Sequence, residues 1–552
     1  MAKDVEITLP NGETRSAPAG TTLYEMLGED LRNSLAKVMA AELGGRYVSL
    51  HEPVWVNSAY LPLTMNDPEG RRSYIRSLSM LVIRAAQDVH REKELILDYS
   101  LGNSLYCHWD ENHLATRNDL ANLDAAMRKL VAADLPITHR RVALDEARTI
   151  FLDEGQKDKA QLLQFSRLDT EDIYELDGWV DSFFGPLVPS TGMLDQFSLL
   201  FYPPGFLLVY PSAGGMEQDE SKVNHTKLFE TLLENERWGS ILGICNLGEL
   251  NSDIVSRNIG DTIKLAETLH EQKLANIAED IISRHARPRF VLVAGPSCSG
   301  KTTFTFRLAI HLRVMGIKAK FISLDDYYRP RESIPPGPDG KQDFESITTL
   351  DTDLLVTHLN ELAVGGEVTM PRYNYSTGLR EEGEHLKLGT DDILIIEGIH
   401  GLNPDLMPGL PRNLAYKIYV SALTQLNFDN HNRVSTTDMR ALRRVVRDAK
   451  FRDWDAVQTL SRFPAVVKGE NRNIFPYQEQ ADIFFNSALI YELAILAPFV
   501  EPLLAAVPPD TPERAEANRL LTLLGHVLPA PLEGVPPTSI IREFVGGSSF
   551  HY

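Results

Sequence analysis

The sequence has few cysteines and no long uninterrupted apolar run. Its three cysteines in 552 residues, Cys107, Cys245 and Cys298, are too few and too scattered for a disulfide framework. This usage indicates a reducing compartment, and we expect the cytoplasm. The most apolar stretch, residues 489–507, is broken by prolines and by glutamates such as Glu492, which are costly in a membrane-spanning helix. The N-terminus lacks the apolar segment of a signal peptide, so we expect neither a signal peptide nor a membrane span.

Positive charge is also scarce. Lys and Arg number 55 against 76 Asp and Glu, which gives a formal net charge of −21. This balance argues against broad, non-specific attraction to nucleic acid or to an anionic membrane, although a local basic patch stays compatible with it. The apolar share of 43% and the charged share of 24% exclude global disorder and a fibrous repeat. At roughly 100–200 residues per domain, the length predicts several domains.

Changes in periodicity divide the chain into five expected segments. The first alternates short strand-like runs with turns, including a hairpin at Asn11-Gly12, which predicts a small α+β module. The second opens on an amphipathic helix over residues 72–92 and mixes helices with strands, and the third is a helical linker. In the fourth, apolar strands alternate with helices, which is typical of a doubly wound α/β domain with a parallel sheet. The expected segments are residues 1–65, 66–222, 223–287, 288–505 and 506–552, the last with one helix and a tail.

A phosphate-binding loop is predicted at the start of the fourth segment. Residues 295–302, GPSCSGKT, match the pattern G-x-x-x-x-G-K-[ST] after an expected strand and ahead of a helical run. In such a loop backbone N–H groups wrap the phosphates, Lys301 reaches the β- and γ-oxygens, and the Thr302 hydroxyl can hold Mg²⁺. The expected nucleotide-binding residues are Gly295, Ser297, Cys298, Ser299, Gly300, Lys301, Thr302 and Thr303.

Two carboxylates follow expected strands of the same domain. The run AKFISLD ends in Asp325, and DDILIIEG places Glu397 at the end of an apolar strand. In an open α/β sheet these positions face the ligand crevice, where Glu397 can bind Mg²⁺ or its water. The alternative for both is structural, as a helix cap or turn residue.

Residues 288–505 resemble the uridine kinase family of nucleoside kinases, within the broader group that includes phosphoribulokinase. The resemblance rests, in the family's order and spacing, on the segments GPSCSGKTT, ISLDDYY, DFESITTLD, PRYNYSTGLR, IIEGIHGL and RALRRVVRDAKFR. It implies an α/β P-loop kinase that uses ATP and Mg²⁺ to phosphorylate the 5′-hydroxyl of a nucleoside. Asp325 would be the general base of that reaction, and Lys301 would bind the phosphates.

The same resemblance suggests which residues hold the nucleoside. Tyr328 would line the pocket, and Tyr373 would pack near the base. Glu345 stands where the family usually has an aspartate that grips the ribose hydroxyls, and Arg380 closes the motif that contains Tyr373. The family's histidine that helps to read a pyrimidine edge is Gly378 here, which leaves the base selectivity open.

A basic segment covers residues 440–452. Four of its arginines recur at helical spacing, so they fall on one face of a helix. A charge run of this kind is usually a solvated face. The resemblance instead places it at the lid, where arginines neutralise the transferring phosphate, and Arg444 and Arg447 are the residues expected to do so.

The front half resembles parts of threonyl-tRNA synthetases. Residues 1–65 resemble a TGS domain, and residues 70–222 resemble the editing-type domain, on RRVALDEARTIF and WVDSFFGPLVPSTG. The synthetase editing site uses histidines and a cysteine to position water and move a proton. The corresponding positions here are Arg76, Met80, Phe183 and Leu187, so the resemblance implies an editing-like domain without editing residues.

These observations favour an ATP-dependent kinase of the uridine kinase type, with a front half that serves binding or regulation. Two alternatives stay open: a kinase for another sugar or sugar-phosphate acceptor, and a non-catalytic protein that senses tRNA or nucleotides. The expected partners are a small nucleoside and, through the N-terminal half, RNA or a nucleotide. The sequence leaves the oligomeric state open.

Overall fold

The structure is a computed structural model. It describes residues 4–33, 37–110, 113–212, 215–216, 225–284, 288–334, 343–374, 377–408, 414–424 and 426–552. Most of the loops expected over residues 212–221 and 330–340 lie outside the described residues.

The first module is a five-stranded sheet with two short helices. Its elements are β1 (Asp4–Thr8), β2 (Thr14–Pro18), α1 (Leu23–Met26), α2 (Gly28–Asn33), β3 (Val38–Leu43), β4 (Arg46–Val48) and β5 (Ser58–Thr64). The strand order is β2-β1-β5-β3-β4. The hairpin expected at Asn11-Gly12 is confirmed, because β1 and β2 pair antiparallel around a turn in which Gly12 has φ +85°. Thr22 opens α1 with a reciprocal cap to Glu25.

The second module packs helices against two sheets. Its elements are α3 (Pro68–Val89), β6 (Leu95–Ser100), β7 (Ser104–Trp109), α4 (Arg117–Ala133), β8 (Thr138–Ala143), α5 (Leu144–Asp153), α6 (Lys157–Gln164), β9 (Thr170–Leu176), β10 (Trp179–Ser182), β11 (Ser198–Tyr202) and β12 (Gly205–Val209). The sheets have the orders β10-β9-β8 and β11-β12-β7-β6. Helix α3 begins four residues before the expected Arg72 because Pro68 occupies its first turn, where a proline is pre-organised for the helix.

The third unit is built on a parallel sheet. Its elements are β13 (Phe290–Ala294), α10 (Lys301–Val314), β14 (Ala319–Ser323), α11 (Thr352–Ala363), β15 (Glu367–Asn374), β16 (Leu379–Lys387), β17 (Ile393–Glu397), β18 (Ala415–Ser421), α12 (Thr436–Phe451), α13 (Ala456–Asn473), β19 (Ile483–Asn486) and α14 (Glu492–Ala505). The sheet runs β14-β17-β13-β18-β19 with every pair parallel, and β15 and β16 form a separate hairpin. Every residue of β13 is buried, as expected for a parallel strand covered on both faces. The predicted doubly wound α/β domain is confirmed.

Two further segments join the core of this sheet. The expected linker forms α7 (Thr226–Leu242), α8 (Leu247–Val255) and α9 (Ile259–Ser283), and the tail forms α15 (Arg514–Gly525) and α16 (Arg542–Val545). Leu274 and Ile277 of α9 and Ile540 of the tail share one apolar cluster with Val291 of β13. Both segments are therefore part of the packed domain, since they supply apolar surface that covers the sheet.

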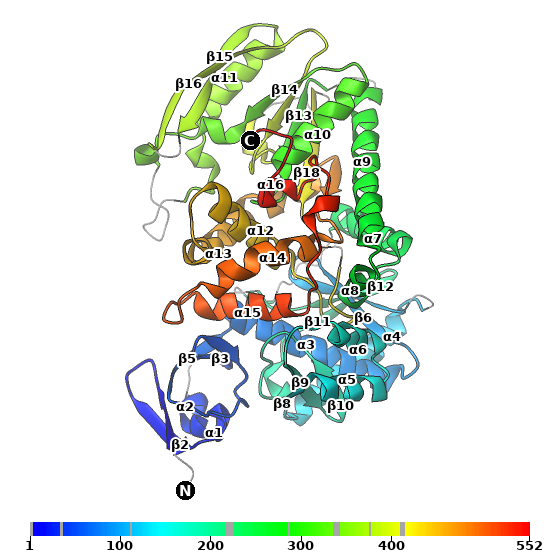
Figure 1. The fold of residues 1–552 in the computed structure, drawn as a ribbon, viewed down its shortest axis with the longest axis vertical. Coiled ribbons are helices and arrows are strands. Elements are labelled where there is room, and N and C mark those ends of the chain that lie inside the picture. Colours follow the sequence, from blue (N-terminus) through cyan, green and yellow to red (C-terminus); the bar gives the residue numbers. More distant parts are fainter. Residues whose placement is uncertain are drawn as a thin grey trace.

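Figure 1 shows the two front modules at one end of the molecule and the parallel sheet at the other, with the chain returning past α15 to finish beside α10. A smaller apolar cluster crosses the boundary, because it joins Tyr106 and Leu207 of the front half to Ala294 and Tyr419 of the sheet. In the part of the chain that the structure describes, no helix combines the length and apolar character needed to cross a membrane.

A buried ionic cluster also joins the two halves. The Lys159 ammonium lies 2.9 Å from Asp181 Oδ1 and 2.8 Å from Asp429 Oδ1, and His431 Nδ1 lies 2.7 Å from Asp181 Oδ2. All four side chains are at most 5% exposed. Burial alone would lower the pKa of Lys159, but Asp181 and Asp429 raise it above its ordinary value. The lysine is therefore the charge that allows two carboxylates to lie together in the interior.

We predict that Lys159→Met destabilises the protein by about 3–5 kcal/mol, because it leaves Asp429 buried without its cation and Asp181 with His431 as its remaining partner. Urea unfolding followed by tryptophan fluorescence measures the change. Lys264→Met is the matched control, since Lys264 forms an exposed ion pair with Asp261 that is worth at most about 1 kcal/mol. Equal effects of the two substitutions would contradict the prediction.

Candidate active site

The predicted P-loop connects β13 to α10, and its two glycines are required by close contacts. A Cβ on Gly295 would lie 1.9 Å from the carbonyl oxygen of Val420. Gly300 has φ +80°, and a Cβ there would lie 2.5 Å from Cγ2 of Ile540. The loop therefore has the backbone conformation and close packing that only glycine accepts at these positions.

Lys301 and Thr302 begin α10 beside two strand ends. Lys301 Nζ donates to the carbonyl of Pro296 at 3.1 Å, and Thr302 Oγ1 donates to Glu397 Oε1 at 3.3 Å. Glu397 ends β17, and Asp325 lies in a short 3₁₀ helix directly after β14, the neighbouring strand. The hydroxyl and carboxylate oxygens of Thr302 and Glu397 are the ligand type that Mg²⁺ takes, so these residues fit the metal.

Negative charge is concentrated around Lys301. Burial raises the pKa of Glu397 to about 7; Lys301 opposes this rise, and Asp325 and Glu543 add to it. Burial likewise raises the pKa of Glu345 to about 7, with Glu470 and Asp325 adding to the rise. Asp325, the expected general base, therefore acts electrostatically on both Glu397, the expected metal ligand, and Glu345, the expected ribose-binding residue.

The expected nucleoside-binding residues gather on the β15–β16 side of the sheet. Tyr328 and Tyr373 meet edge to face with ring centroids 5.6 Å apart, and Asp326 Oδ1 accepts the backbone N–H of Tyr373 at 3.2 Å. Arg380 pairs with Asp351 at 2.9 Å. Arg380 thus ties the hairpin to the N-terminus of α11.

Gly378 lies in the turn of this hairpin. Its φ is +71°, its carbonyl accepts the backbone N–H of Arg331 at 2.9 Å, and a Cβ would lie 3.0 Å from Cβ of Arg331. A side chain at this position would be strained in the conformation seen here. The hairpin therefore offers only backbone at the position where the resemblance expects a histidine.

Helix α12 packs against the P-loop through its arginines. Arg440 Nε donates to the carbonyl of Ser297 at 2.9 Å, and Arg443 NH1 donates to the carbonyl of Cys298 at 3.1 Å. Arg444 NH1 donates to Ser297 Oγ at 3.2 Å. Arg447, the second arginine expected at the lid, pairs with the neighbouring Asp448 at 2.8 Å, and Arg444 lies 3.3 Å from the same carboxylate.

Buried glutamates complete this arrangement, and sequence reasoning did not find them. Glu470 of α13 pairs with Arg440 and accepts the backbone N–H of Ser297 at 2.9 Å. Glu492 pairs with Arg443, and both side chains are at most 1% exposed. The sequence does contain an indication of the role of Glu492. A glutamate inside the most apolar stretch of the chain needs a buried cationic partner.

The C-terminal segment also reaches the site. Glu543 Oε2 accepts the Thr303 hydroxyl at 2.6 Å and the Thr303 backbone N–H at 3.4 Å, and the Tyr552 hydroxyl lies 2.9 Å from the same threonine. The first N–H groups of a helix have no partner within the helix and attract anions. Glu543 thus places a carboxylate at the phosphate-binding end of α10.

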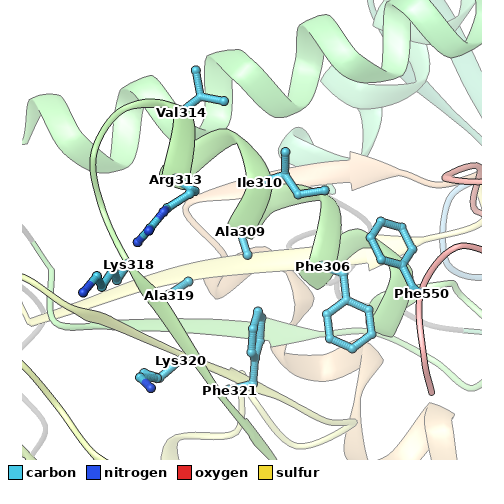
Figure 2. Close-up of a pocket in the computed structure, with 10 residues that line it drawn as sticks. All are labelled: Phe306, Ala309, Ile310, Arg313, Val314, Lys318, Ala319, Lys320, Phe321 and Phe550. Carbon is cyan, nitrogen blue, oxygen red and sulfur yellow. The ribbon is translucent and has the colours of Figure 1, made fainter.

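A separate groove of about 550 Å³ lies between α10 and β14. Figure 2 shows Phe306, Phe321 and Phe550 on its apolar side, with Arg313 and Lys318 at the other end. The Phe306 ring centroid is 5.5 Å from that of Phe550. None of the residues predicted for the phosphate or nucleoside site lines this groove.

The four positions that correspond to an editing site hold paired or buried side chains, and two of them, Arg76 and Phe183, also line a cavity of about 150 Å³. Arg76 NH2 donates to the carbonyl of Pro186 at 3.1 Å and pairs with Glu69. Met80, Phe183 and Leu187 are at most 2% exposed and belong to the core of the second module. No acid or base at these four positions faces solvent, and this arrangement does not suit hydrolysis.

A P-loop on a doubly wound parallel sheet, with carboxylates at the ends of two neighbouring strands, is the arrangement of a P-loop nucleotide-binding domain. Residues 290–490 match the model of the Phosphoribulokinase / Uridine kinase family. The chain thus carries a kinase domain of this family.

The N-terminal part is similar to threonine–tRNA ligases. It is 32% identical over 202 residues to the enzyme of Symbiobacterium thermophilum, a match that covers 36% of this chain and 31% of that protein. It is 27% identical over 201 residues to threonine–tRNA ligase 1 of Bacillus subtilis, with the same two shares. The chain thus spans 31% of the length of the curated relatives that it matches.

Two solved structures are similar at lower identity. A possible uridine kinase from Bacillus stearothermophilus is 18% identical with a TM-score of 0.28, covering 39% of this chain and 98% of that chain. The phosphoribulokinase from Rhodobacter spheroides is 20% identical with a TM-score of 0.25, covering 36% and 70%. At these identities and TM-scores, the two similarities do not indicate which substrate this chain binds.

We predict that Glu345→Gln stabilises the protein in a pH-dependent way. Above pH 7 the folded protein holds an ionised Glu345 against its burial, whereas below pH 4.5, the ordinary pKa, folded and unfolded forms both bind the proton. The free energy of unfolding should therefore rise by up to about 3 kcal/mol at pH 8, and this gain should fall to zero below about pH 4.5. Urea unfolding across this range measures it, with the exposed Glu382→Gln as control. A gain that does not change with pH would contradict the prediction.

We also predict that Glu543→Gln tightens ATP binding roughly 3- to 10-fold, since about 1 kcal/mol of charge repulsion at the phosphate-binding end of α10 is removed. Fluorescence titration with ATP measures the affinity. Glu533→Gln, in the same segment but exposed, should leave it unchanged. Weaker ATP binding by Glu543→Gln would show that the carboxylate supports the nucleotide instead of opposing it.

Proposed function

We propose that the protein transfers the γ-phosphate of ATP to the 5′-hydroxyl of a nucleoside. The observation that carries this proposal is the P-loop, which begins α10 with Lys301 and Thr302, binds Thr302 to Glu397 at the end of β17, and lies beside the neighbouring strand β14 that Asp325 follows. The kinase domain of the matched family supports the reaction type.

The proposed mechanism relies on positioning and charge. The P-loop N–H groups and Lys301 bind the phosphates, and Thr302 and Glu397 hold Mg²⁺, which neutralises phosphate charge when bound. Glu345 accepts hydrogen bonds from sugar hydroxyls. Asp325 takes the proton of the acceptor hydroxyl as the oxygen bonds to the γ-phosphorus and the bond to the ADP leaving group breaks.

A second acceptor class is favoured by Gly378. Because the hairpin turn presents no side chain there, one group expected to read a pyrimidine is missing. A kinase for another sugar or a sugar phosphate would need only the sugar-binding part of the site. In either case we propose that the front half contributes binding, of RNA or a nucleotide, and no hydrolysis.

A panel of nucleosides, sugars and sugar phosphates incubated with ATP and Mg²⁺ tests the proposal. We predict that Lys301→Ala and Asp325→Asn each lower kcat at least 100-fold, the lower end of the range for a positioned base. ATP affinity separates their roles, since Asp325→Asn should keep it and Lys301→Ala should weaken it. The surface variant Asp353→Asn is the control for the change of charge.

Near wild-type turnover by Asp325→Asn would exclude Asp325 as the base. Phosphorylation of a sugar phosphate in preference to every nucleoside would favour the second acceptor class. Salt-dependent RNA binding without turnover of any acceptor would instead support a binding protein in which the P-loop domain is a switch.

A further inference from the structure

A cavity of about 150 Å³ lies where the front half, α12 and α15 meet. Leu97, Leu105 and the pair Phe183 and Phe184 form its apolar wall. One carboxylate, that of Asp438, is among its described lining residues. The cationic lining residues are Arg72, Arg76, His431, Arg433 and Arg519.

Most of these charges are already paired. An alternating chain of ion pairs runs through Arg76, Glu69, Arg72, Glu516, Arg519 and Asp438. The four links from Glu69 onward have N–O distances of 2.5–2.7 Å. His431 pairs with Asp181 on another side. Three arginines thus meet three carboxylates, and this chain of pairs is neutral.

Arg433 is the cationic lining residue that remains outside these ion pairs. Among the described residues its guanidinium has no hydrogen bond and no ion pair, although the residue is only partly exposed. Burial lowers its pKa, and Tyr210 and Asp438 offset this only in part. A half-buried guanidinium without a partner is unfavourable, and its planar donors suit an oxyanion.

The N-terminus of α12 adds positive potential beside Arg433. Ser435 caps the helix by accepting the backbone N–H of Thr437 at 3.2 Å, and Ser435 itself lines the cavity. The helix is 16 residues long, so its N-terminal end carries appreciable positive potential. Arg433 and Ser435, at this helix end, therefore line the same small cavity.

We propose that this cavity binds a small oxyanion, a phosphate or carboxylate group, through Arg433. Ligand pockets for drug-sized molecules are roughly 300–1,000 Å³, so a volume of about 150 Å³ suits such a group and excludes a whole nucleotide. The proposal does not rest on the kinase function, since none of the residues predicted for phosphoryl transfer lines the cavity.

Isothermal titration calorimetry with inorganic phosphate, and separately with acetate, tests the proposal. The full-length chain is used with Lys301→Ala throughout, because the P-loop would otherwise bind phosphate as well. We predict one saturable site per chain, weakened at least 10-fold by Arg433→Ala and less by Arg433→Lys. The matched control Arg148→Ala removes an exposed arginine on α5 and should leave the affinity unchanged. The titrant that binds identifies the oxyanion.

A melting experiment separates binding from folding. Without any anion, Arg433→Ala should melt at a higher temperature than its parent, because an unpaired charge is removed. Phosphate or acetate at ten times its Kd should raise the melting temperature of the parent and of Arg148→Ala, but not of Arg433→Ala. The proposal is overturned if neither anion binds, if Arg433→Ala binds as tightly as the parent, or if Arg433→Ala melts lower than its parent without anion.

Discussion

The guanidinium groups of α12 hold the backbone of the P-loop, and the geometry of the site depends on this contact. A loop that turns its N–H groups toward phosphates leaves carbonyl oxygens on its other side, and those oxygens need donors. Arg440 and Arg443 supply them at Ser297 and Cys298. Each arginine is buried and is neutralised by a buried glutamate, so the loop is fixed before any nucleotide binds. Such pre-organisation lets binding energy act on the phosphates instead of on ordering the loop.

The other parts of the chain converge on the same helix. Asp438, in the first turn of α12, pairs with Arg519 of α15, which is linked through Glu516 to Arg72 of α3. Lys450, in the last turn, donates to the carbonyl of Val545 in the C-terminal segment. The front half, the tail and the P-loop are thus all attached to α12. A rotation of this helix would disturb the nucleotide site and the domain boundary together.

Local patterns predicted much of the fold and of the site. The apolar run of β13, the glycine spacing of the P-loop and the carboxylates after β14 and β17 are features of short segments, so periodicity and motif are sufficient to find them. The same reasoning could not assign partners across long separations. It identified the arginines of α12 as a charged face, but Glu470 and Glu492 lie 30 and 49 residues from their partners. Nothing in the sequence around Glu543 shows that it reaches Thr303, 240 residues away, because that contact arises from the packing of the tail.

The cluster around Lys159 determines when the front half can finish folding. Lys159 and Asp429 are separated by 270 residues, and the ribosome adds roughly 5–20 residues per second. The front half therefore leaves the ribosome many seconds before Asp429 is made, with Lys159 and Asp181 in place but the second carboxylate missing. Until then this face stays hydrated and the apolar cluster around Tyr106 lacks the residues of the parallel sheet. A nascent chain of this protein consequently exposes its future domain boundary until the parallel sheet has been made.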